Sequence, residues 1–396
     1  MNSSSLPIDE TIWNDSQLLS QQLQALSERL FSPEENKVLR KFTSAETAKL
    51  VGITDSYIRQ LAKQDSGLIP EKTQNGRRSF SLEEVHAVRR FLGESKPAYM
   101  PTRTGSQPLQ TIAVTNFKGG SGKTTTSIHL AQYLAMRGYR VLAIDLDPQA
   151  SMSAMFGLQP EFDVDENETL YGAIRYDDER KPISEIIRKT YFSGLDLIPA
   201  NLELQEFEHD TPMHLSSSNR DPRDLFFMRI ANAIQEVEQE YDVVVLDCPP
   251  QLGYLTLAAL SAATSVLITV HPQMLDVASM NQFLAMTSNL LKVVGDAGGN
   301  LNYDWMSYVI TRHEPNDGPQ AQIAAFLRSL FGERVLTSTM LKSTAVSDAG
   351  LSKQTIYEAG RETMNRRTYD RAVEAMDNVN SEIEQLVKKT WKEASL

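Results

Sequence analysis

Short apolar runs alternate with stretches of helical spacing from Thr111 to the end of the chain. Runs such as 243–246 are apolar at every position, which is typical of strands covered by helices on both faces of a parallel sheet. Strands are therefore predicted at 112–117, 141–145, 195–199, 243–247, 266–270, 306–311 and 335–339. This alternation predicts an α/β domain with a doubly wound, mostly parallel sheet.

Two further helices are predicted at the ends of the chain. Leu19, Leu23, Leu26 and Leu30 recur at spacings of four, three and four, which predicts a helix over 16–31. This helix would either pack on its own domain or form a dimer contact, and two heptads do not decide between these. A long helix is predicted over 366–392, and the polar stretches 162–178 and 209–221 are predicted to be mobile loops.

The residues before the sheet form a separate, smaller unit in this interpretation. Residues 97–108 carry three prolines and one glycine without apolar periodicity, as expected of a linker. The predicted organisation is an N-terminal helix at 1–34, a small α-rich unit at 35–100, a linker at 101–110 and the α/β domain at 111–396.

The balance of basic and acidic residues differs between the small N-terminal unit and the rest of the chain. The 396 residues have a formal net charge of −12, which argues against a surface that coats nucleic acid everywhere. Residues 35–105, however, hold 13 basic and 8 acidic side chains, whereas the rest holds 26 and 43. The small unit is thus the part suited to an anionic partner.

Cysteine content and hydropathy argue against a disulfide-bonded, secreted or membrane-spanning protein. Cys248 is the single cysteine, so neither an internal disulfide nor a cysteine-built metal cluster can form within one chain. The first residues lack a basic stretch followed by an apolar one, and no apolar run approaches about 20 residues. We therefore expect a cytoplasmic protein without a membrane partner.

The strongest chemical motif follows the first predicted strand of the α/β domain and opens a helix. Glycines there let backbone N–H groups surround a phosphate, the lysine reaches its oxygens and the first threonine can bind Mg²⁺. The front glycine of the usual P-loop pattern is replaced by Phe117, so the following glycines must supply the freedom of the loop. The expected ATP or ADP site consists of Lys118, Gly119, Gly120, Ser121, Gly122, Lys123, Thr124 and Thr125.

Carboxylates end two of the predicted strands. Asp145 and Asp147 end the strand at 141–145, where ligands bind in such sheets. Asp247 ends the apolar run 243–246 and is expected to help hold Mg²⁺ with Thr124.

A second motif lies in the basic unit. Ala48, Gly52, Ile53, Ile58 and Leu61 have the spacing of a helix-turn-helix. The second helix, about 55–63, would present Ser56, Tyr57, Arg59, Gln60 and Lys63 to DNA. Residues 75–80 read as a hairpin, or wing, with Arg77 and Arg78 at its tip, and Ser81 with Glu84 forms a capping box that opens another helix.

Together these motifs resemble known families. The order KGGSGKTT, DLDPQ, LDCPP is similar to the ParA family of DNA-segregation ATPases over about 110–396, and the basic unit resembles a MerR-like winged helix-turn-helix. A winged unit before a ParA-type ATPase resembles the RepA group of repABC-type replicons, notably over 42–92 and 116–151. The resemblance implies a nucleoid-associated ATPase that segregates a low-copy replicon and represses its own operon under the control of the bound nucleotide.

The same resemblance implies partners and residue roles. The chain would form a homodimer, bind operator and non-specific DNA, and work with a ParB-like (RepB) centromere-binding protein. Lys118 would reach the partner's nucleotide across the dimer, Asp147 would position the attacking water, and Asp145 and Asp247 would organise Mg²⁺. By analogy, Arg312 and Lys342 are expected to form a second, sequence-independent DNA surface on the ATPase.

Three alternatives remain. A MinD-like membrane-positioning ATPase shares the KGGxGKT motif but needs a C-terminal amphipathic anchor and has no place for the winged unit. A metabolic enzyme with a related P-loop, such as a dethiobiotin-synthetase-like ligase, is a second. The nitrogenase iron protein needs two cluster cysteines per subunit, and Cys248 is alone. A transcription regulator with a degenerate ATPase is the third.

Overall fold

The computed structural model describes residues 7–30, 37–64, 67–71, 76–217, 224–299 and 301–394. Contacts divide the chain into two units, Met1–Val38 and Leu39–Leu396. The first contains helix α1 (Ile8–Leu30), which begins eight residues earlier than predicted. Phe31, the last residue of the predicted helix, and the side chains of Leu23, Leu26 and Leu30 lie outside the described part.

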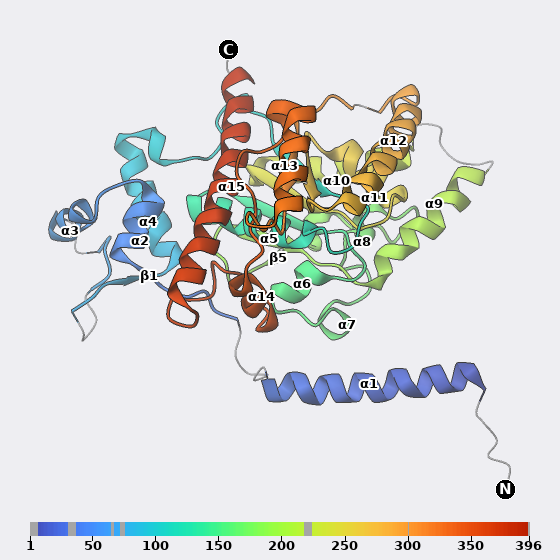
Figure 1. The fold of residues 1–396 in the computed structure, drawn as a ribbon, viewed down its shortest axis with the longest axis horizontal. Helices are drawn as coiled ribbons and strands as arrows, with labels where there is room; N and C mark the ends of the chain where they lie inside the picture. The colour runs from blue at the N-terminus through green and yellow to red at the C-terminus, as the bar shows by residue number, and fades with distance from the viewer. Residues whose placement is uncertain are drawn as a thin grey trace, which may run out of the picture. The chain divides into compact units, whose positions relative to one another are not determined.

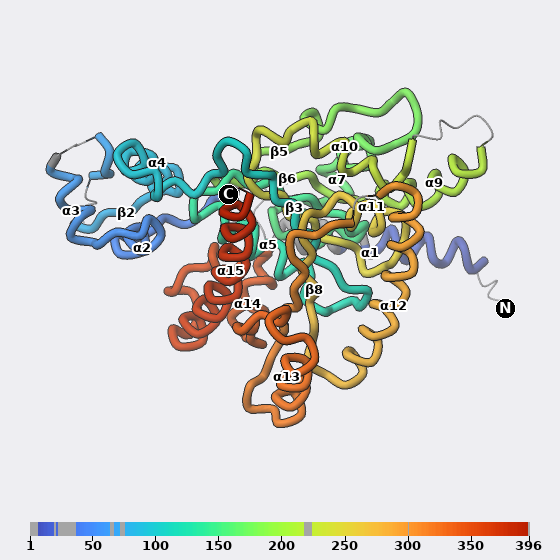
Figure 2. The backbone as a smooth tube through the Cα atoms, turned by 90° about the horizontal axis from the view of Figure 1, so that it is seen from above, coloured from blue at the N-terminus to red at the C-terminus, as the bar shows by residue number. Residues whose placement is uncertain are grey.

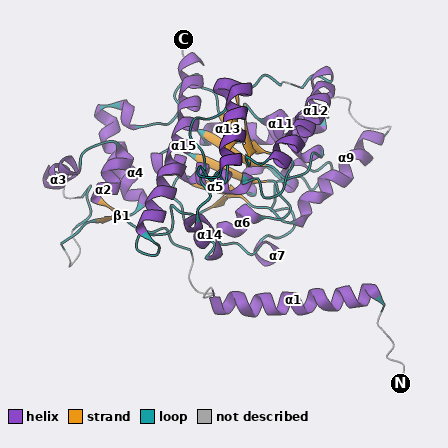
Figure 3. Cartoon of the chain, viewed as in Figure 1, coloured by secondary structure: helices purple, strands orange, loops and turns teal. Residues whose placement is uncertain are grey.

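A seven-stranded sheet forms the centre of the second unit (Figures 1 and 3). The strand order is β5-β6-β4-β7-β3-β8-β9, and all pairs are parallel except β5 with β6. The strands are β3 (Gln110–Thr115), β4 (Val141–Asp145), β5 (Arg188–Lys189), β6 (Leu195–Ile198), β7 (Val243–Asp247), β8 (Ser265–Val270) and β9 (Trp305–Ile310). The predicted doubly wound, mostly parallel α/β sheet is confirmed.

Helices cover both faces because alternate strand residues point to opposite sides. Val243 and Val245 pack into one apolar core with α5 (Lys123–Arg137) and α15 (Arg366–Ala394). Val244 and Leu246 pack into the other core with α10 (Arg229–Glu236) and α11 (Tyr254–Ala262). The remaining α-helices of this domain are α6 (Ser151–Met155), α7 (Pro160–Asp163), α8 (Tyr171–Ile174), α9 (Glu206–Ser216), α12 (Met274–Asp296), α13 (Gly318–Phe331) and α14 (Thr344–Leu351).

The predicted strand at 335–339 is wrong. Pairing there is limited to isolated bridges between Tyr308 and Val335 and between His313 and Leu341. Val335, Leu336 and Met340 are buried, so the apolar pattern reflects a segment packed on the edge of the sheet.

The prediction of a loop is wrong for 209–216, and it holds for 162–178 outside α7 and α8. The stretch 162–178 contains α8, all of whose residues are buried, and Arg175 bonds Asn167 and Asp177. Residues 209–216 belong to α9, whose Phe207 and Thr211 are buried, while 218–221 lie outside the described part.

The basic unit folds as two helices joined by a tight turn, followed by a third helix. Helix α2 (Ser44–Val51) ends at Gly52, whose φ of +84° is readily adopted only by glycine, and α3 (Asp55–Gln64) follows. Strand β1 (Phe42–Thr43) pairs antiparallel with β2 (Ser79–Phe80) directly before α4 (Leu82–Ser95). The predicted Ser81–Glu84 capping box is present at the start of α4.

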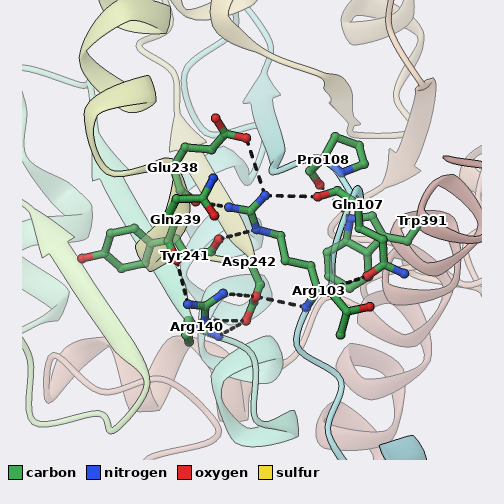
Figure 4. Close-up of polar contacts among 10 residues, drawn as sticks. Arg103, Gln107, Pro108, Arg140, Glu238, Gln239, Tyr241, Asp242 and Trp391 are labelled. Carbon is green, nitrogen blue, oxygen red and sulfur yellow. Dashed lines mark hydrogen bonds and ion pairs between the residues drawn. The ribbon is translucent and has the colours of Figure 1, made fainter. Parts of the chain in front are cut away.

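The stretch predicted as a linker is fixed to the α/β domain (Figure 4). The Arg103 backbone N–H donates to Asp242 Oδ1 at 3.1 Å, and its guanidinium donates to the Tyr241 carbonyl at 2.9 Å and to the Glu238 carbonyl. Asp242 is fully buried and is also paired with Arg140. The Trp391 ring N–H donates to the Pro108 carbonyl at 2.8 Å, which ties the same stretch to α15.

No described helix is both long enough and apolar enough to span a bilayer.

Candidate functional site

The glycine-rich loop joins β3 to α5 at the carboxyl edge of the sheet. Gly120 and Gly122 have φ values of +74° and +90°, a region that other residues rarely adopt. A Cβ at Gly122 would lie 3.3 Å from Thr311, whereas Gly119 faces open space. The side chain of Ser121 is buried and accepts from Thr269 Oγ1 at 3.0 Å. The backbone of Gly119 and Gly120 is therefore exposed, while the buried Ser121 side chain fixes the loop to β8.

Lys123 is the first residue of α5, and the charges of Asp247 and Asp147 act on its ammonium group. Its side chain is buried, and Nζ donates to the Lys118 carbonyl at 3.2 Å. Burial lowers the pKa of Lys123, while Asp247 and Asp147 favour its charged form. Among the described residues, the hydrogen bond of this ammonium goes to a neutral carbonyl, so the charge is well suited to bind phosphate oxygens.

Asp247 ends β7 directly beside β3 and faces the start of α5. Its Oδ1 accepts from Ser127 Oγ at 2.9 Å, and the nearby Thr124 hydroxyl favours the ionised form of this carboxylate and so lowers its pKa. Its Oδ2 is buried and has no hydrogen-bond partner among the described residues. An orphaned carboxylate oxygen beside a threonine hydroxyl fits a Mg²⁺ ion that takes its remaining ligands from water and phosphate.

Asp145 ends β4 and is in register with Asp247 on β7. Its Oδ2 accepts from the backbone and hydroxyl of Ser153 at 2.9 and 2.8 Å, and its Oδ1 accepts from the Asp147 backbone at 3.2 Å. Burial and the neighbouring Asp247 raise the pKa of Asp145 to about 8, and burial raises that of Asp247 to about 6. A cation between these carboxylates would relieve their repulsion.

Asp147 follows β4 and lies at the mouth of the site. Its Oδ1 accepts from the Gln149 backbone N–H at 3.0 Å, which holds the carboxylate in a tight turn. Asp147 is half-buried, in contrast to the fully buried Asp145 and Asp247, so it can reach water.

Lys118 and its neighbour Phe117 contact residues of α12 and its preceding loop that were not predicted to belong to the site. Its side chain forms an ion pair with Asp276 in the first turn of α12, and Asp276 Oδ2 lies 2.9 Å from His271 Nδ1. Phe117, which replaces the usual glycine, stacks on Phe283 of the same helix at 5.4 Å. Both contacts join positions more than 150 residues apart, and no local pattern signals them.

Arg312 and Lys342 lie near the same loop. Arg312 follows β9 with a positive φ of 52°, and its Nη1 donates to the Gly120 carbonyl at 3.1 Å. Lys342 is exposed and pairs with Glu314 at 2.9 Å. Arg312 therefore contacts the phosphate loop directly, whereas Lys342 does not contact it.

Five of the residues predicted to face DNA lie on α3 (Asp55–Gln64). Ile58 and Leu61 are buried, so Ser56, Arg59, Gln60 and Lys63 of α3 are exposed and Tyr57 is half-buried. Arg59 forms an ion pair with Asp55 one turn earlier. Arg77 is exposed just before β2, while Arg78 Nε donates to the Pro70 carbonyl at 3.0 Å. The predicted hairpin over 75–80 is not formed as such, because Ser79 and Phe80 pair with Thr43 and Phe42 of β1 instead, and Asn75 lies outside the described part.

Comparison with known proteins identifies one matching family and several similar sequences. The family described as AAA domain matches residues 109–296. A putative replication protein A from Rhizobium rhizogenes is 59% identical over 94% of this chain and 93% of its own length. The chromosome partitioning protein ParA of Caulobacter vibrioides is 30% identical over 62% of this chain and 85% of its own length.

Solved structures agree on the fold. A structure titled "Partition Protein" superposes with a TM-score of 0.64 over 94% of this chain and 98% of its own, at 19% identity. Cobyrinic acid a,c-diamide synthase from Mycobacterium smegmatis, solved with ADP and magnesium, has a TM-score of 0.50 and 25% identity over 61% of this chain and 94% of its own.

Proposed function

Because this chain belongs to the ParA family of partition ATPases, we propose that it hydrolyses ATP to segregate a low-copy replicon and represses its own operon through its winged unit. One observation carries the proposal. A glycine-rich phosphate loop, two strand-end carboxylates and an exposed helix-turn-helix occur in one folded unit. Its relatives named replication protein A and ParA support the same biological role.

The nucleotide chemistry follows from the residues at the edge of the sheet. The exposed backbone of Gly119 and Gly120 would surround the phosphates, and Lys123 would leave the Lys118 carbonyl to bind their oxygens. Thr124 and Asp247 would hold Mg²⁺, with Asp145 fixing the arrangement behind them. Bound Mg²⁺ neutralises phosphate charge as hydrolysis proceeds. Asp147 would orient the attacking water, and ADP and phosphate would be released.

A matched set of binding measurements tests the function as a whole. The full chain is titrated onto its own promoter DNA and onto random DNA, each with ADP and with ATP and Mg²⁺. We expect specific promoter binding and a separate, ATP-dependent and salt-sensitive binding to random DNA. ATP turnover should rise when the ParB-like partner and DNA are added. No turnover under any of these conditions would instead favour a regulator with a degenerate ATPase.

The Lys118 side chain is expected to act in dimerisation. Lys118→Ala should still bind ATP as a monomer but should fail to form the ATP-dependent dimer, because a lysine that serves the partner's nucleotide adds nothing to its own. Light scattering with ATP and Mg²⁺ measures this. Lys292→Ala, which removes an exposed lysine of α12, is the matched control. Asp276→Asn keeps Lys118 but removes its ion pair, so it separates the role of the lysine from that of the pair. If Lys118→Ala still forms the ATP-dependent dimer, Lys118 has no role in dimerisation.

The outer face of α3 is expected to read the operator. Arg59→Ala should weaken promoter binding by about 1–3 kcal/mol if Arg59 contacts a base, with ATP turnover unchanged. Arg77→Ala combined with Arg78→Ala should instead lower the salt dependence, as expected for phosphate contacts. Ser56, Tyr57, Gln60 and Lys63 complete the proposed surface. Footprints identical to those of the unchanged protein in both variants would limit α3 to a structural role.

The second DNA surface, at Arg312 and Lys342, stays a prediction. Because Arg312 bonds the Gly120 carbonyl, its substitution would disturb nucleotide binding as well as DNA binding. Lys342 is the cleaner probe, since its described partner is Glu314 on the surface.

A further inference from the structure

A cavity of about 570 Å³ lies between α4, the segment that follows α4, α5 and α15. Its size falls in the range of small-molecule sites, about 300–1,000 Å³. Figures 1 and 2 both show the chain after α4 running toward the carboxyl-terminal part of α15. The lining includes Arg137 at the last position of α5, whereas the phosphate loop leads into its first residue, Lys123. The two ends of this 15-residue helix lie about 20 Å apart, so the cavity is separate from the nucleotide site.

One apolar core holds the walls of this cavity in place. Leu92 of α4, Leu134 of α5 and Val387 of α15 belong to the same cluster of buried side chains. His86 Nε2 of α4 also lies 2.8 Å from the Ala135 carbonyl of α5. Walls that share a core are fixed relative to one another, which favours a preformed site over one that opens by domain movement.

Basic side chains dominate the charge of the lining. The chain as a whole has a formal net charge of −12, so this cluster is opposite in sign to the rest of the protein. A concave surface that carries one sign of charge attracts small ions of the opposite sign. We call it the basic cavity, and its charged lining residues are Arg89, Lys96, Arg137 and Lys388 with one carboxylate, Glu384.

Glu384 neutralises only part of this positive charge. Its Oε1 lies 2.7 Å from Lys388 Nζ, and its Oε2 lies 3.5 Å from Arg137 Nε. Burial raises the pKa of Glu384, but Arg137 and Lys388 together lower it more, so the carboxyl group is ionised at neutral pH. Because two cations share this one carboxylate, the basic cavity keeps an excess of positive charge.

The described hydrogen bonds of Arg89 go to neutral carbonyl groups. Arg89 is 5% exposed, its Nη1 donates to the Tyr99 carbonyl at 3.1 Å, and its Nη2 donates to the Leu50 carbonyl. Its Nε is buried and has no hydrogen-bond partner among the described residues. A buried guanidinium bonded to neutral oxygens has lost its hydration, and an anion beside it would compensate for that loss.

Arg137 brings a second guanidinium to the same oxygen. Its Nη1 lies 3.4 Å from the Leu50 carbonyl that Arg89 also contacts. Burial, and after it the charge of Arg137, lowers the pKa of Arg89 to about 10. An anion close to both guanidinium groups would offset their repulsion and favour the charged form of each.

The donors of the lining suit phosphate oxygens. A guanidinium presents its N–H groups in a planar fork that matches a phosphate, and a lysine adds a point charge. Thr102 and Thr104 bring hydroxyl groups to the same cavity. Because the cations come from several segments around the cavity, a ligand with more than one phosphate would meet more of them than a single phosphate does. A DNA duplex contacts exposed cations, so the buried Arg89 favours a small anion.

We propose that the basic cavity binds a small anion that carries two or more phosphate groups. The inference goes beyond the proposed function and does not rest on it, because it needs neither ATP turnover nor operator binding. Since the cavity exists in the folded chain alone, the bound anion should also raise the unfolding temperature.

The probe is inorganic pyrophosphate, titrated into the full chain in buffer without Mg²⁺. ADP is present at a concentration just sufficient to fill the phosphate loop, so that the loop does not take up the probe. Isothermal titration calorimetry should show a single additional site per chain, and inorganic phosphate should bind there more weakly. Lys123→Ala, which weakens the phosphate loop, should bind pyrophosphate at this site as the unchanged protein does.

Lys96→Gln combined with Lys388→Gln removes two exposed cations of the basic cavity. The affinity for pyrophosphate should fall by about tenfold or more, as expected when charge-assisted hydrogen bonds are lost. Lys389→Gln combined with Lys392→Gln is the matched control, because it removes two exposed lysines of α15 that do not line the cavity. This control should bind pyrophosphate as the unchanged protein does. Matching thermal unfolding curves for the two double variants exclude lost folding as the cause of lost affinity.

Each other result overturns the inference. Failure of the unchanged protein to bind pyrophosphate while ADP fills the loop means that the basic cavity is not an anion site. Unchanged binding in the Lys96 and Lys388 double variant places the probe elsewhere, and an equal loss in the control assigns it to general surface charge. If a short random-sequence duplex displaces pyrophosphate and is weakened by the same two substitutions, the cavity receives DNA phosphates rather than a small anion. None of these results depends on ATP turnover or promoter binding, so the proposed function is tested separately.

Discussion

Replacement of Lys123 by alanine is expected to weaken ATP binding by about 100-fold. Hydrogen bonds between charged groups contribute about 1.5–3 kcal/mol, and each 1.4 kcal/mol corresponds to a factor of ten. We expect a free-energy loss near the upper end of this range, because the Lys123 ammonium is buried and its one described hydrogen bond is to a neutral carbonyl. Isothermal titration with a non-hydrolysed ATP analogue and Mg²⁺ measures the effect.

The Lys123 variant should remain folded, because burial of an ammonium without a direct ion pair costs stability rather than adding it. Lys392→Ala, at an exposed position of α15, is the matched control and should bind as the unchanged protein does. An unchanged affinity in Lys123→Ala would place the phosphates elsewhere in the molecule.

Replacement of Asp147 by alanine is expected to stop turnover while ATP still binds. Asp147 is half-buried at the mouth of the site, whereas Asp145 and Asp247 are buried behind it. Loss of a residue that orients water or accepts its proton lowers the rate by about 10²–10⁴-fold. Phosphate release measured at saturating ATP, together with a binding titration, separates these two effects.

Asp178→Ala removes an exposed carboxylate from the loop after α8 and serves as the control for Asp147. Turnover by Asp147→Ala at the rate of this control would remove Asp147 from the mechanism. A parallel loss of ATP binding would give it a role in holding the nucleotide instead.

The core of the fold could be predicted because its signals are local. Strands β4 and β7 have the predicted bounds, since each is an uninterrupted apolar run that ends in an aspartate. The pairing of Asp145 with Asp247 then follows from adjacent parallel strands ending at one edge. The turn between α2 and α3 could be predicted for the same reason, because Gly52 marks the turn and Ile58 and Leu61 mark the buried face.

The features that could not be predicted arise from contacts between residues far apart in the sequence. Val335 and Leu336 look like a strand, but they are buried at the edge of the sheet, where only isolated bridges form. Strand β5 has two charged residues and no apolar alternation, so nothing in its sequence indicates pairing. The Lys118–Asp276 ion pair and the Arg137–Leu50 contact each need a folded chain to exist.

The anchoring of residues 101–108 determines where this protein can be divided. A cut at Gln107 would leave Arg103 in the N-terminal piece, yet its partners Glu238, Tyr241 and Asp242 lie in the α/β domain. A fragment beginning at Gln107 would lose the Arg103 backbone N–H that donates to the buried Asp242, and the guanidinium that donates to the Tyr241 and Glu238 carbonyls. Chimaeras that exchange the winged unit between relatives should therefore be joined before Arg103. A protease should cut this stretch slowly despite its prolines and glycine, because its backbone is already bonded at both ends.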